Sequence, residues 1–398
     1  MRTLAVVNVG QILSGKLENG IVQGDALFIE NGRFAQVGDR NSIDLRAADT
    51  VLDAKGACVA PGLIDSHVHI VFGDWTPRQN ALGWIESYMH GGVTGMMSAS
   101  EVHVPGVPQD PVGVKALAIA AQRCFANFRP GGVKVYAGSI IFQPGLTEGD
   151  FEEMADAGVW LGKVGFGSFA QPTEAEPLVR MAQRHGFKVM SHTGGASIPG
   201  SASVTAEDLM ILQPDIAGHA NGGTTALPDE GVELLIREAE FALQICQAGN
   251  IRSATKIIEL ARSHGQLHRI LIASDTPSGT GVMPMAAIKS VVEVSALNGL
   301  PAPEAWALAS GNPARVLGLN SGKIEVGRDA DFVVIDAPLG CVKKDAVGAI
   351  ENGDIPGISC VVIDGVIRAM RSRNTPAPTR QAEVLCPGVE PLNNGQRS

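Results

Sequence analysis

The chain has 398 residues, of which 45% are hydrophobic and 18% are charged, and its formal net charge is −10. This length exceeds what one small core accommodates, so we expect one large domain and one smaller domain. The composition is that of a globular protein. No basic stripe appears, which argues against nucleic acid as a partner, and no apolar run is long enough to span a bilayer.

The N-terminal block, residues 1–60, alternates short β-type runs with glycine and asparagine turns. The apolar part of residues 1–8 is too short for a signal peptide and is typical of a first strand. Asn31-Gly32 separates the runs 26–29 and 34–37, and such a step between two β-type runs is a strong hairpin signal.

Residues 61–318 change character, because short apolar runs alternate there with longer helical stretches such as 115–127, 174–185 and 251–264. Eight βα units in a block of this length predict an α/β fold of the (β/α)8 TIM-like barrel type, in which the chemistry lies where the strands end. The expected strands are residues 63–65, 94–98, 133–137, 160–164, 188–191, 215–218, 241–245 and 270–274.

The β character returns after the barrel, with a second hairpin pattern around Asp364-Gly365. We therefore expect residues 1–60 and 319–371 to form one small β-sandwich domain, with the barrel of residues 61–318 inserted between its two halves. Residues 372–398, rich in proline and polar side chains, are expected to form an extended C-terminal arm.

The six cysteines are scattered and form no CxxC pair, which suits free thiols in a cytoplasmic protein better than a disulfide framework. Cys124 and Cys246 lie in apolar stretches, so we expect both of them in the core.

His67 and His69 are separated by one residue at the end of an apolar strand. Alternate residues of a strand point to the same face, so the two imidazoles project together. Two imidazoles that converge at the end of a buried strand fit two ligands of one metal ion. The alternative is an exposed hairpin with two solvated histidines.

Further metal-competent or ionisable side chains lie at the ends of other expected strands, whereas the second, third and seventh strands contribute nothing comparable. Taken singly, each has a structural alternative: a lysine that reaches solvent, a satisfied core histidine, or an aspartate that caps a helix. Together they would share one rim of the barrel with the histidine pair. These residues are Lys163 in the fourth strand, His192 after the fifth, His219 after the sixth and Asp275 after the eighth.

This ordered set resembles the amidohydrolase superfamily over nearly the whole chain. The resemblance rests on the motif Pro61-Gly62-Leu63-Ile64-Asp65-Ser66-His67-Val68-His69, on Gly91-Gly92-Val93-Thr94 and on the closing segment 322–334. Within the superfamily, residues 74–79, 192–201 and 274–281 are similar to the enamidases, which open the cyclic enamide of a partly reduced 6-oxonicotinate.

The resemblance implies two adjacent divalent metal ions, with zinc expected and iron, manganese or cobalt suited to the same ligands. A carbamate formed from carbon dioxide on the bridging lysine would supply an anion, whereas an unmodified ammonium would repel the cations. Some relatives have a glutamate at this position. One ion would be held by His67, His69 and Asp275 and the other by His192 and His219, with Lys163 as the bridge.

A water between two cations loses a proton near neutral pH. The expected activity is therefore hydrolysis of a C–N bond in a cyclic amide or enamide (a lactam) by metal-activated hydroxide. Asp275 would be the general base and then the acid that protonates the leaving nitrogen. A deaminase or an amide or ester hydrolase on the same centre is an alternative. A non-catalytic assembly scaffold is a third hypothesis, against which the complete ligand set argues.

Several residues are candidates for contact with a small-molecule substrate. Arg78, in the loop after the first strand, could grip a carboxylate, and His103 lies in the loop after the second. Thr193, Gly194 and Asn221 lie in segments that bring bare backbone close to the site; ordinary turn geometry is the alternative. The resemblance also fits a homo-oligomer, either a tetramer or a dimer.

Overall fold

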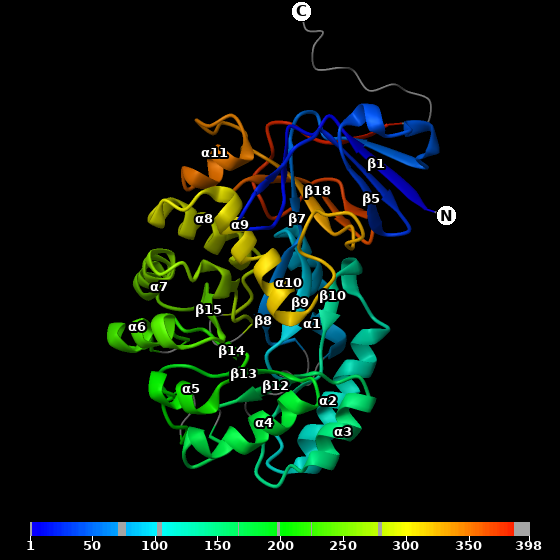
Figure 1. Ribbon diagram of the computed structural model, residues 1–398. Coiled ribbons are helices and arrows are strands. Elements are labelled where there is room, and N and C mark those ends of the chain that lie inside the picture. Colours follow the sequence, from blue (N-terminus) through cyan, green and yellow to red (C-terminus); the bar gives the residue numbers. More distant parts are fainter. Residues whose placement is uncertain are drawn as a thin grey trace, which may run out of the picture.

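The computed structural model describes residues 2–70, 77–101, 106–165, 167–196, 200–223, 225–277 and 281–385, with the side chains of residues 77–82 left out of the description. In Figure 1, the first strands (blue) and the last strands (orange and red) lie together at one end of the molecule. The segments between them, cyan to yellow, form the helix-covered remainder.

Parallel strands form the centre of the larger part, in two sheets whose strands follow chain order. Helices connect most of these strands, so the fold is a TIM-barrel-like α/β fold. The first sheet contains β8 (Leu63–Val68), β9 (Val93–Ser98) and β10 (Lys134–Tyr136), and the second contains β11 (Ser139–Ile141), β12 (Leu161–Val164), β13 (Lys188–Ser191), β14 (Ile216–Ala217), β15 (Ala242–Cys246) and β16 (Ile270–Ala273).

Several helices, α2, α5, α7 and α11, begin at a side chain that caps the first turn. Asn250 caps α7 by accepting a hydrogen bond from the backbone N–H of Ser253, and Ile257, Ile258 and Ala261 form the buried face of that helix. The helices are α1 (Pro77–His90), α2 (Pro111–Ala126), α3 (Glu148–Asp156), α4 (Glu176–Arg184), α5 (Ala206–Leu212), α6 (Asp229–Glu238), α7 (Ile251–Ser263), α8 (Ala286–Asn298), α9 (Ala302–Leu308), α10 (Gly311–Leu317) and α11 (Ala346–Glu351).

The prediction of one continuous third strand at residues 133–137 is wrong, because the structure has two short strands in this region, β10 and β11. β10 pairs with β9, whereas β11 pairs with β12. Gly138 separates them with a φ of 95°, a conformation that glycine adopts readily. The carboxylate of Glu101 accepts hydrogen bonds from the N–H groups of Gly138 and Ser139, which satisfies amides that the interrupted strand leaves unpaired.

The end of β8 is joined to the segment that follows β16. The N–H of Asp275 donates to the carbonyl of His67 at 3.0 Å, and the N–H of His69 donates to the carbonyl of Thr276 at 3.3 Å. Asp275 has a φ of 58°, an uncommon value for a residue other than glycine. These backbone contacts place Asp275 beside the histidine pair.

The β domain consists of two mixed sheets, with strand orders β20-β6-β1-β4-β5 and β19-β18-β17-β7-β2-β3. Both expected hairpins are present, and Asn31-Gly32 and Asp364-Gly365 take the positive φ angles of two-residue turns. The strands are β1 (Thr3–Val7), β2 (Gln11–Leu13), β3 (Ile21–Val22), β4 (Ala26–Glu30), β5 (Arg33–Gly38), β6 (Thr50–Asp53), β7 (Cys58–Pro61), β17 (Phe332–Asp336), β18 (Gly357–Ile363), β19 (Val366–Ala369) and β20 (Glu383–Leu385).

One hydrophobic cluster draws side chains from both sheets of the β domain, among them Leu27 of β4, Ile12 of β2 and Phe332 of β17. The segment after residue 371 adds to this domain, because β20 pairs antiparallel with β6. Arg380 of the same segment forms an ion pair with the buried carboxylate of Asp336. Within residues 2–385, the N-terminal and C-terminal segments therefore share their sheets.

The cysteines of the described residues are free thiols, in agreement with the sequence. Cys246 is buried as expected, but the expectation for Cys124 is wrong, since its side chain lies on the exposed face of α2. In the described residues, no helix combines the length and the apolar character needed to cross a membrane.

Candidate metal centre

Three of the predicted ligands bring their donor atoms together. The Nε2 atoms of His67 and His69 lie 3.2 Å and 3.1 Å from Oδ1 of Asp275. One ligand atom from each residue lies within 4.8 Å of the other two. Two imidazole nitrogens and a carboxylate oxygen, converging on one point, make up a donor set that suits a divalent transition metal.

The other ring nitrogen of each histidine is held by a neighbouring polar side chain. Nδ1 of His67 donates to Oε1 of Gln244 at 2.6 Å, and Nδ1 of His69 lies in hydrogen-bond contact with Oγ of Ser100 at 3.2 Å. Burial lowers the pKa of His67 to about 4. Its Nε2 therefore carries a lone pair near neutral pH, as a metal ligand requires.

Lys163 is fully buried in β12, with 0% of its surface exposed. Its Nζ lies 3.4 Å from Nε2 of His67 and 3.1 Å from Sδ of Met190. Burial lowers the pKa of this amine to about 8. A substantial share of the amine is thus uncharged at slightly alkaline pH, and the side chain does not reach solvent.

His192 and His219 extend the cluster away from β8. Their ring centroids are 4.6 Å apart, and those of His67 and His219 are 5.4 Å apart. Nε2 of His192 donates to the carbonyl of Gly195 at 2.8 Å, which leaves the lone pair on Nδ1. Burial lowers the pKa of His192 to about 4 and that of His219 far below its ordinary value. Both rings are therefore uncharged and able to bind a cation.

Nδ1 of His219 is buried and makes no hydrogen bond within the described residues. A buried nitrogen without a hydrogen-bond partner is costly in a folded protein unless a bound group satisfies it. A cation between the rings of His219 and His192 would do so. The donor set and this nitrogen together indicate that the residues fit divalent metal ions.

The carboxylate of Asp275 is buried, and its two oxygens lie in different surroundings. Oδ1 lies among the histidines. Its second oxygen, Oδ2, faces an exposed glycine: a Cβ at position 223 would lie 3.3 Å from it. On the side of the loop after β14, Oδ2 therefore lies beside a residue without a side chain.

The residues predicted to contact substrate differ in their surroundings. Thr193 is buried, and its Oγ1 makes no hydrogen bond within the described residues. The N–H and carbonyl of Gly194 pair with Val204. The amide of Asn221 bonds to the backbone of Cys246, so it holds the loop after β14 to the end of β15. The prediction that Arg78 lies in a loop is wrong, because its backbone belongs to the first turn of α1. The side chain of Arg78 and the whole of His103 lie outside the described residues.

Two orienting side chains were not expected from the sequence, Gln244 of β15 and Ser100 after β9. The second and seventh strands thus contribute to the cluster through neighbours of the ligands. The available signal for Gln244 was a glutamine between Leu243 and Ile245 in an apolar run, because an amide in that position needs buried partners.

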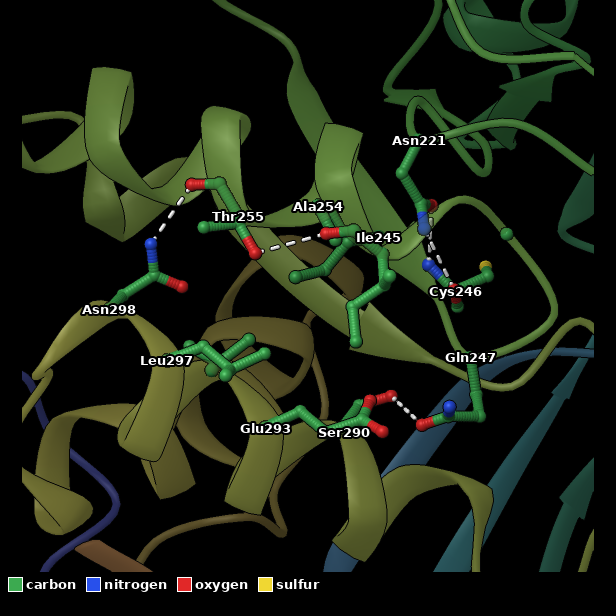
Figure 2. A pocket seen from close by; sticks show the side chains of 13 residues that line it. Asn221, Ile245, Cys246, Gln247, Ala254, Thr255, Ser290, Glu293, Leu297 and Asn298 are labelled. Carbon is green, nitrogen blue, oxygen red and sulfur yellow. Dashed lines mark hydrogen bonds between the residues drawn. The ribbon is translucent and has the colours of Figure 1, made fainter. Parts of the chain in front are cut away.

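A separate cavity lies between α7 and α8 (Figure 2), and none of the predicted metal ligands lines it. Across its lining, Ser290 donates to Gln247 at 2.7 Å, and Asn298 donates to the carbonyl of Thr255 at 3.0 Å. Asn221 lines the cavity from the side of the metal cluster. The cavity and the cluster are therefore neighbouring but distinct features.

A second acidic group, Asp329, Asp331 and Asp364, also has the spacing of metal ligands. Nζ of Lys134 lies 2.6–2.9 Å from an oxygen of each carboxylate, and Arg129 contacts Asp364 at 2.7 Å. A lysine ammonium already occupies the position that a cation would take, so this group is an ion-pair network.

Comparison with known proteins adds to this geometry. The sequence profile of the amidohydrolase family matches residues 58–368. The enamidase of Eubacterium barkeri is 44% identical over 386 residues, which cover 97% of this chain and 100% of that protein. A crystal structure of an enamidase superposes with a TM-score of 0.92 at 43% identity, covering 96% of this chain and 100% of the other. An imidazolonepropionase of Maricaulis maris is 25% identical, covering 84% and 92%.

Proposed function

Because the chain belongs to the amidohydrolase family, we propose that it is a metal-dependent hydrolase that opens a cyclic amide or enamide at its C–N bond. The resemblance drawn from the sequence motifs is thereby confirmed at the level of the family. Similarity to an enamidase over nearly the full length of both chains supports the C–N bond as the target. The observation that carries the proposal is the convergence of His67, His69 and Asp275 beside a buried lysine.

We propose that two divalent ions occupy the cluster. When bound, such ions lower the pKa of a water between them and polarise the carbonyl of the substrate. Zinc is the ion that we expect, with iron, manganese or cobalt suited to the same donors. His67, His69 and Asp275 would hold one ion, His192 and His219 the other, and Lys163 would bridge them.

Lys163 would bridge as a carbamate. Its amine adds to carbon dioxide, a C–N bond forms and a proton is released, which converts a cationic side chain into an anionic one with two oxygen donors. The reaction requires an uncharged amine, and the burial that lowers the pKa of Lys163 to about 8 supplies it. A buried ammonium beside His67 would instead repel the cations.

Asp275 would transfer the proton in both halves of the reaction. Oδ1 lies among the histidines, whereas Oδ2 faces the exposed Gly223 and is the oxygen placed to meet substrate. Oδ2 takes a proton from the water that attacks the carbonyl carbon and delivers it to the nitrogen as the C–N bond breaks. The products are a carboxylate and an amine. With an enamide, the released enamine tautomerises to an imine, which water can cleave to an aldehyde and ammonia.

For the substrate pocket we retain Arg78, His103, Thr193, Gly194 and Asn221 as candidates. Thr193 is supported by its buried and unsatisfied hydroxyl beside His192. For Gly194 and Asn221, whose polar groups bond within the loops, a part in shaping the pocket is more consistent with the contacts.

We propose the full architecture as a closed (β/α)8 barrel of residues 61–318 with a β-sandwich of residues 1–60 and 319–371. Residues 372–398 would be an extended arm, which lies against the sandwich through the pairing of β20 with β6. Pairing of the backbone at Thr276 with Val68 supports closure between the first and eighth strands. The shared hydrophobic cluster supports the sandwich. We further propose a cytoplasmic homo-oligomer, a tetramer or a dimer, acting on a small-molecule substrate.

The experiment combines metal analysis with a substrate panel. The purified protein should contain up to two divalent ions per chain, and removal by a chelator should abolish hydrolysis, which zinc or cobalt should restore. The panel contains 6-oxo-1,4,5,6-tetrahydronicotinate, simple lactams, aryl amides, esters and amino-heterocycles. Turnover of the cyclic enamide and lactams alone supports the proposal. Preferred release of ammonia from amino-heterocycles would instead favour a deaminase, and preferred cleavage of esters an esterase.

A further inference from the structure

Gln244 lies on the seventh strand of the barrel-like region and points to its interior. The preceding alternate residue, Ala242, packs in an interior cluster with Leu161, Met190 and Leu271, whereas Leu243 and Ile245 pack in the cluster that includes the helices. Because side chains alternate along a strand, Gln244 shares the inward direction of Ala242. Its side chain is 0% exposed, so every polar atom of its amide needs a partner inside the protein.

The orientation of this amide is determined by β8. Its Nε2 donates to the Oγ of Ser66 at 2.7 Å and to the backbone carbonyl of Ser66 at 3.2 Å. Oε1 is therefore the atom turned toward His67, at 2.6 Å from Nδ1. Since Oε1 is only an acceptor, the proton of His67 must lie on Nδ1 and its lone pair on Nε2.

Gln244 also reaches the turn that carries His219. Oε1 accepts a hydrogen bond from the backbone N–H of His219 at 3.4 Å, and the backbone carbonyl of Gln244 accepts one from Ala220 at 2.6 Å. His219 has a φ of 37°, an uncommon conformation that needs support from its surroundings. The same residue thus contacts a ligand proposed for each of the two ions.

We propose that Gln244 is a positioning residue that fixes the tautomer of His67 and the turn of His219, and so sets the affinity of both metal sites. The inference rests on the proposed metal centre. Outer-shell groups that hold ligand histidines typically change metal affinity by about 10–100-fold when they are removed. An apolar residue of similar size would fill the space of Gln244 but would leave Nδ1 of His67 without an acceptor.

The test uses the full-length protein after metal removal, titrated with cobalt(II) and followed by visible absorption, with thermal unfolding of the metal-free form beside it. In Gln244→Leu we expect cobalt affinity to fall by about 10–100-fold and the visible bands to change. Gln244→Glu keeps an oxygen acceptor opposite Nδ1 of His67 and should restore affinity close to that of the natural protein. Gln247→Leu, three residues away on the cavity side, is the control and should bind cobalt unchanged.

The inference would be overturned if Gln244→Leu bound cobalt as tightly as the natural protein does and showed the same visible absorption bands. Equal weakening in Gln244→Leu and Gln244→Glu together with equal loss of metal-free stability would also overturn it, since packing alone explains that result. If Gln244→Leu does not fold, Ser66→Ala takes its place: it removes the 2.7 Å acceptor of the amide and must weaken cobalt binding for the inference to stand. A natural protein that binds no cobalt would overturn the metal centre itself.

Discussion

At the scale of single residues, the two roles proposed for Asp275 fall on its two carboxylate oxygens. Its Oδ1 lies 3.1–3.2 Å from the Nε2 atoms of His67 and His69, in the position of a ligand. Its Oδ2 lies on the side of the exposed Gly223 and is the oxygen that we propose as the proton acceptor. Neither role depends on a helix cap, because Asp275 precedes Thr276 in a backbone segment paired with β8.

Replacement of Asp275 should separate catalysis from folding. In Asp275→Asn the side chain can no longer accept a proton from water, so we expect kcat to fall by about 10²–10⁴-fold. Steady-state hydrolysis of the cyclic enamide, with metal content measured in parallel, checks this. Asp215→Asn is a matched control, since Asp215 precedes β14 at the opposite end and bonds to Lys188. Near-natural kcat in a metal-loaded Asp275→Asn would contradict the assigned role.

The buried imidazoles should make the metal-free protein sensitive to acid. Burial lowers the pKa of His67 and His192 from 6.5 to about 4. Between pH 6.5 and pH 4 the unfolded chain therefore binds protons that the folded chain does not, and the free energy of unfolding falls as the pH falls. Each group contributes at most about 1.4 kcal/mol per pH unit.

Urea unfolding of the metal-free protein across this pH range measures that slope. His192→Gln removes one of the two buried imidazoles and should reduce the slope. Equal slopes in the natural protein and in His192→Gln would count against a buried uncharged imidazole.

At the scale of secondary-structure elements, the interruption between β10 and β11 depends on a buried acid. Glu101 follows β9, and its carboxylate accepts from the N–H groups of Gly138 and Ser139. Burial raises the pKa of this carboxyl to about 7, against an ordinary value of 4.5. The folded state therefore favours the protonated acid, and the stability that it contributes declines as the pH rises from 4.5 to 7.

Glu101→Gln tests this account of the interruption. The amide oxygen still accepts from the two N–H groups, while no charge is buried at high pH. We expect the melting temperature of the variant, relative to the natural protein, to be higher at pH 8 than at pH 5. Glu153→Gln, exposed on α3, controls for the change in net charge. A melting-temperature difference independent of pH would rule out the buried, protonated acid.

At the scale of the whole molecule, an ion-pair network joins the barrel-like part to the β domain. Lys134 of β10 extends to Asp329 and Asp331, which precede β17, and to Asp364 in the turn between β18 and β19. Asp331 is only 1% exposed, so its charge depends on this partner. The lysine also prevents the three carboxylates from acting as a second metal site.

Removal of the Lys134 ammonium should lower the stability of the folded protein. In Lys134→Met the three carboxylates lose the cation that they share, although Asp364 keeps its pair with Arg129. Because the buried Asp331 is then left unpaired, we expect about 3–5 kcal/mol lower free energy of unfolding. Lys115→Met is the matched control: Lys115 also contacts two carboxylates, but on the surface between α2 and α3, and should cost no more than about 1 kcal/mol. Denaturant unfolding compares the two. Equal losses would show that the network contributes no more than a surface pair.

Much of the fold and of the candidate site could be predicted from the sequence, because the signals for them lie in short segments of the chain. The strand period placed His67 and His69 on one face, and turn residues identified the hairpins at Asn31-Gly32 and Asp364-Gly365. Family motifs then indicated the amidohydrolase fold and C–N hydrolysis, and both are supported by the full-length similarity.

The remaining features required the tertiary structure, since they depend on contacts between residues far apart in sequence. Gln244 meets His67 across 177 positions, and Lys134 meets Asp331 across 197. The break at Gly138 depends on Glu101, and the exposure of Cys124 depends on which face of α2 is covered. Local patterns specify the direction of a side chain within its own strand or helix, but only packing of the elements decides which partner it finds there.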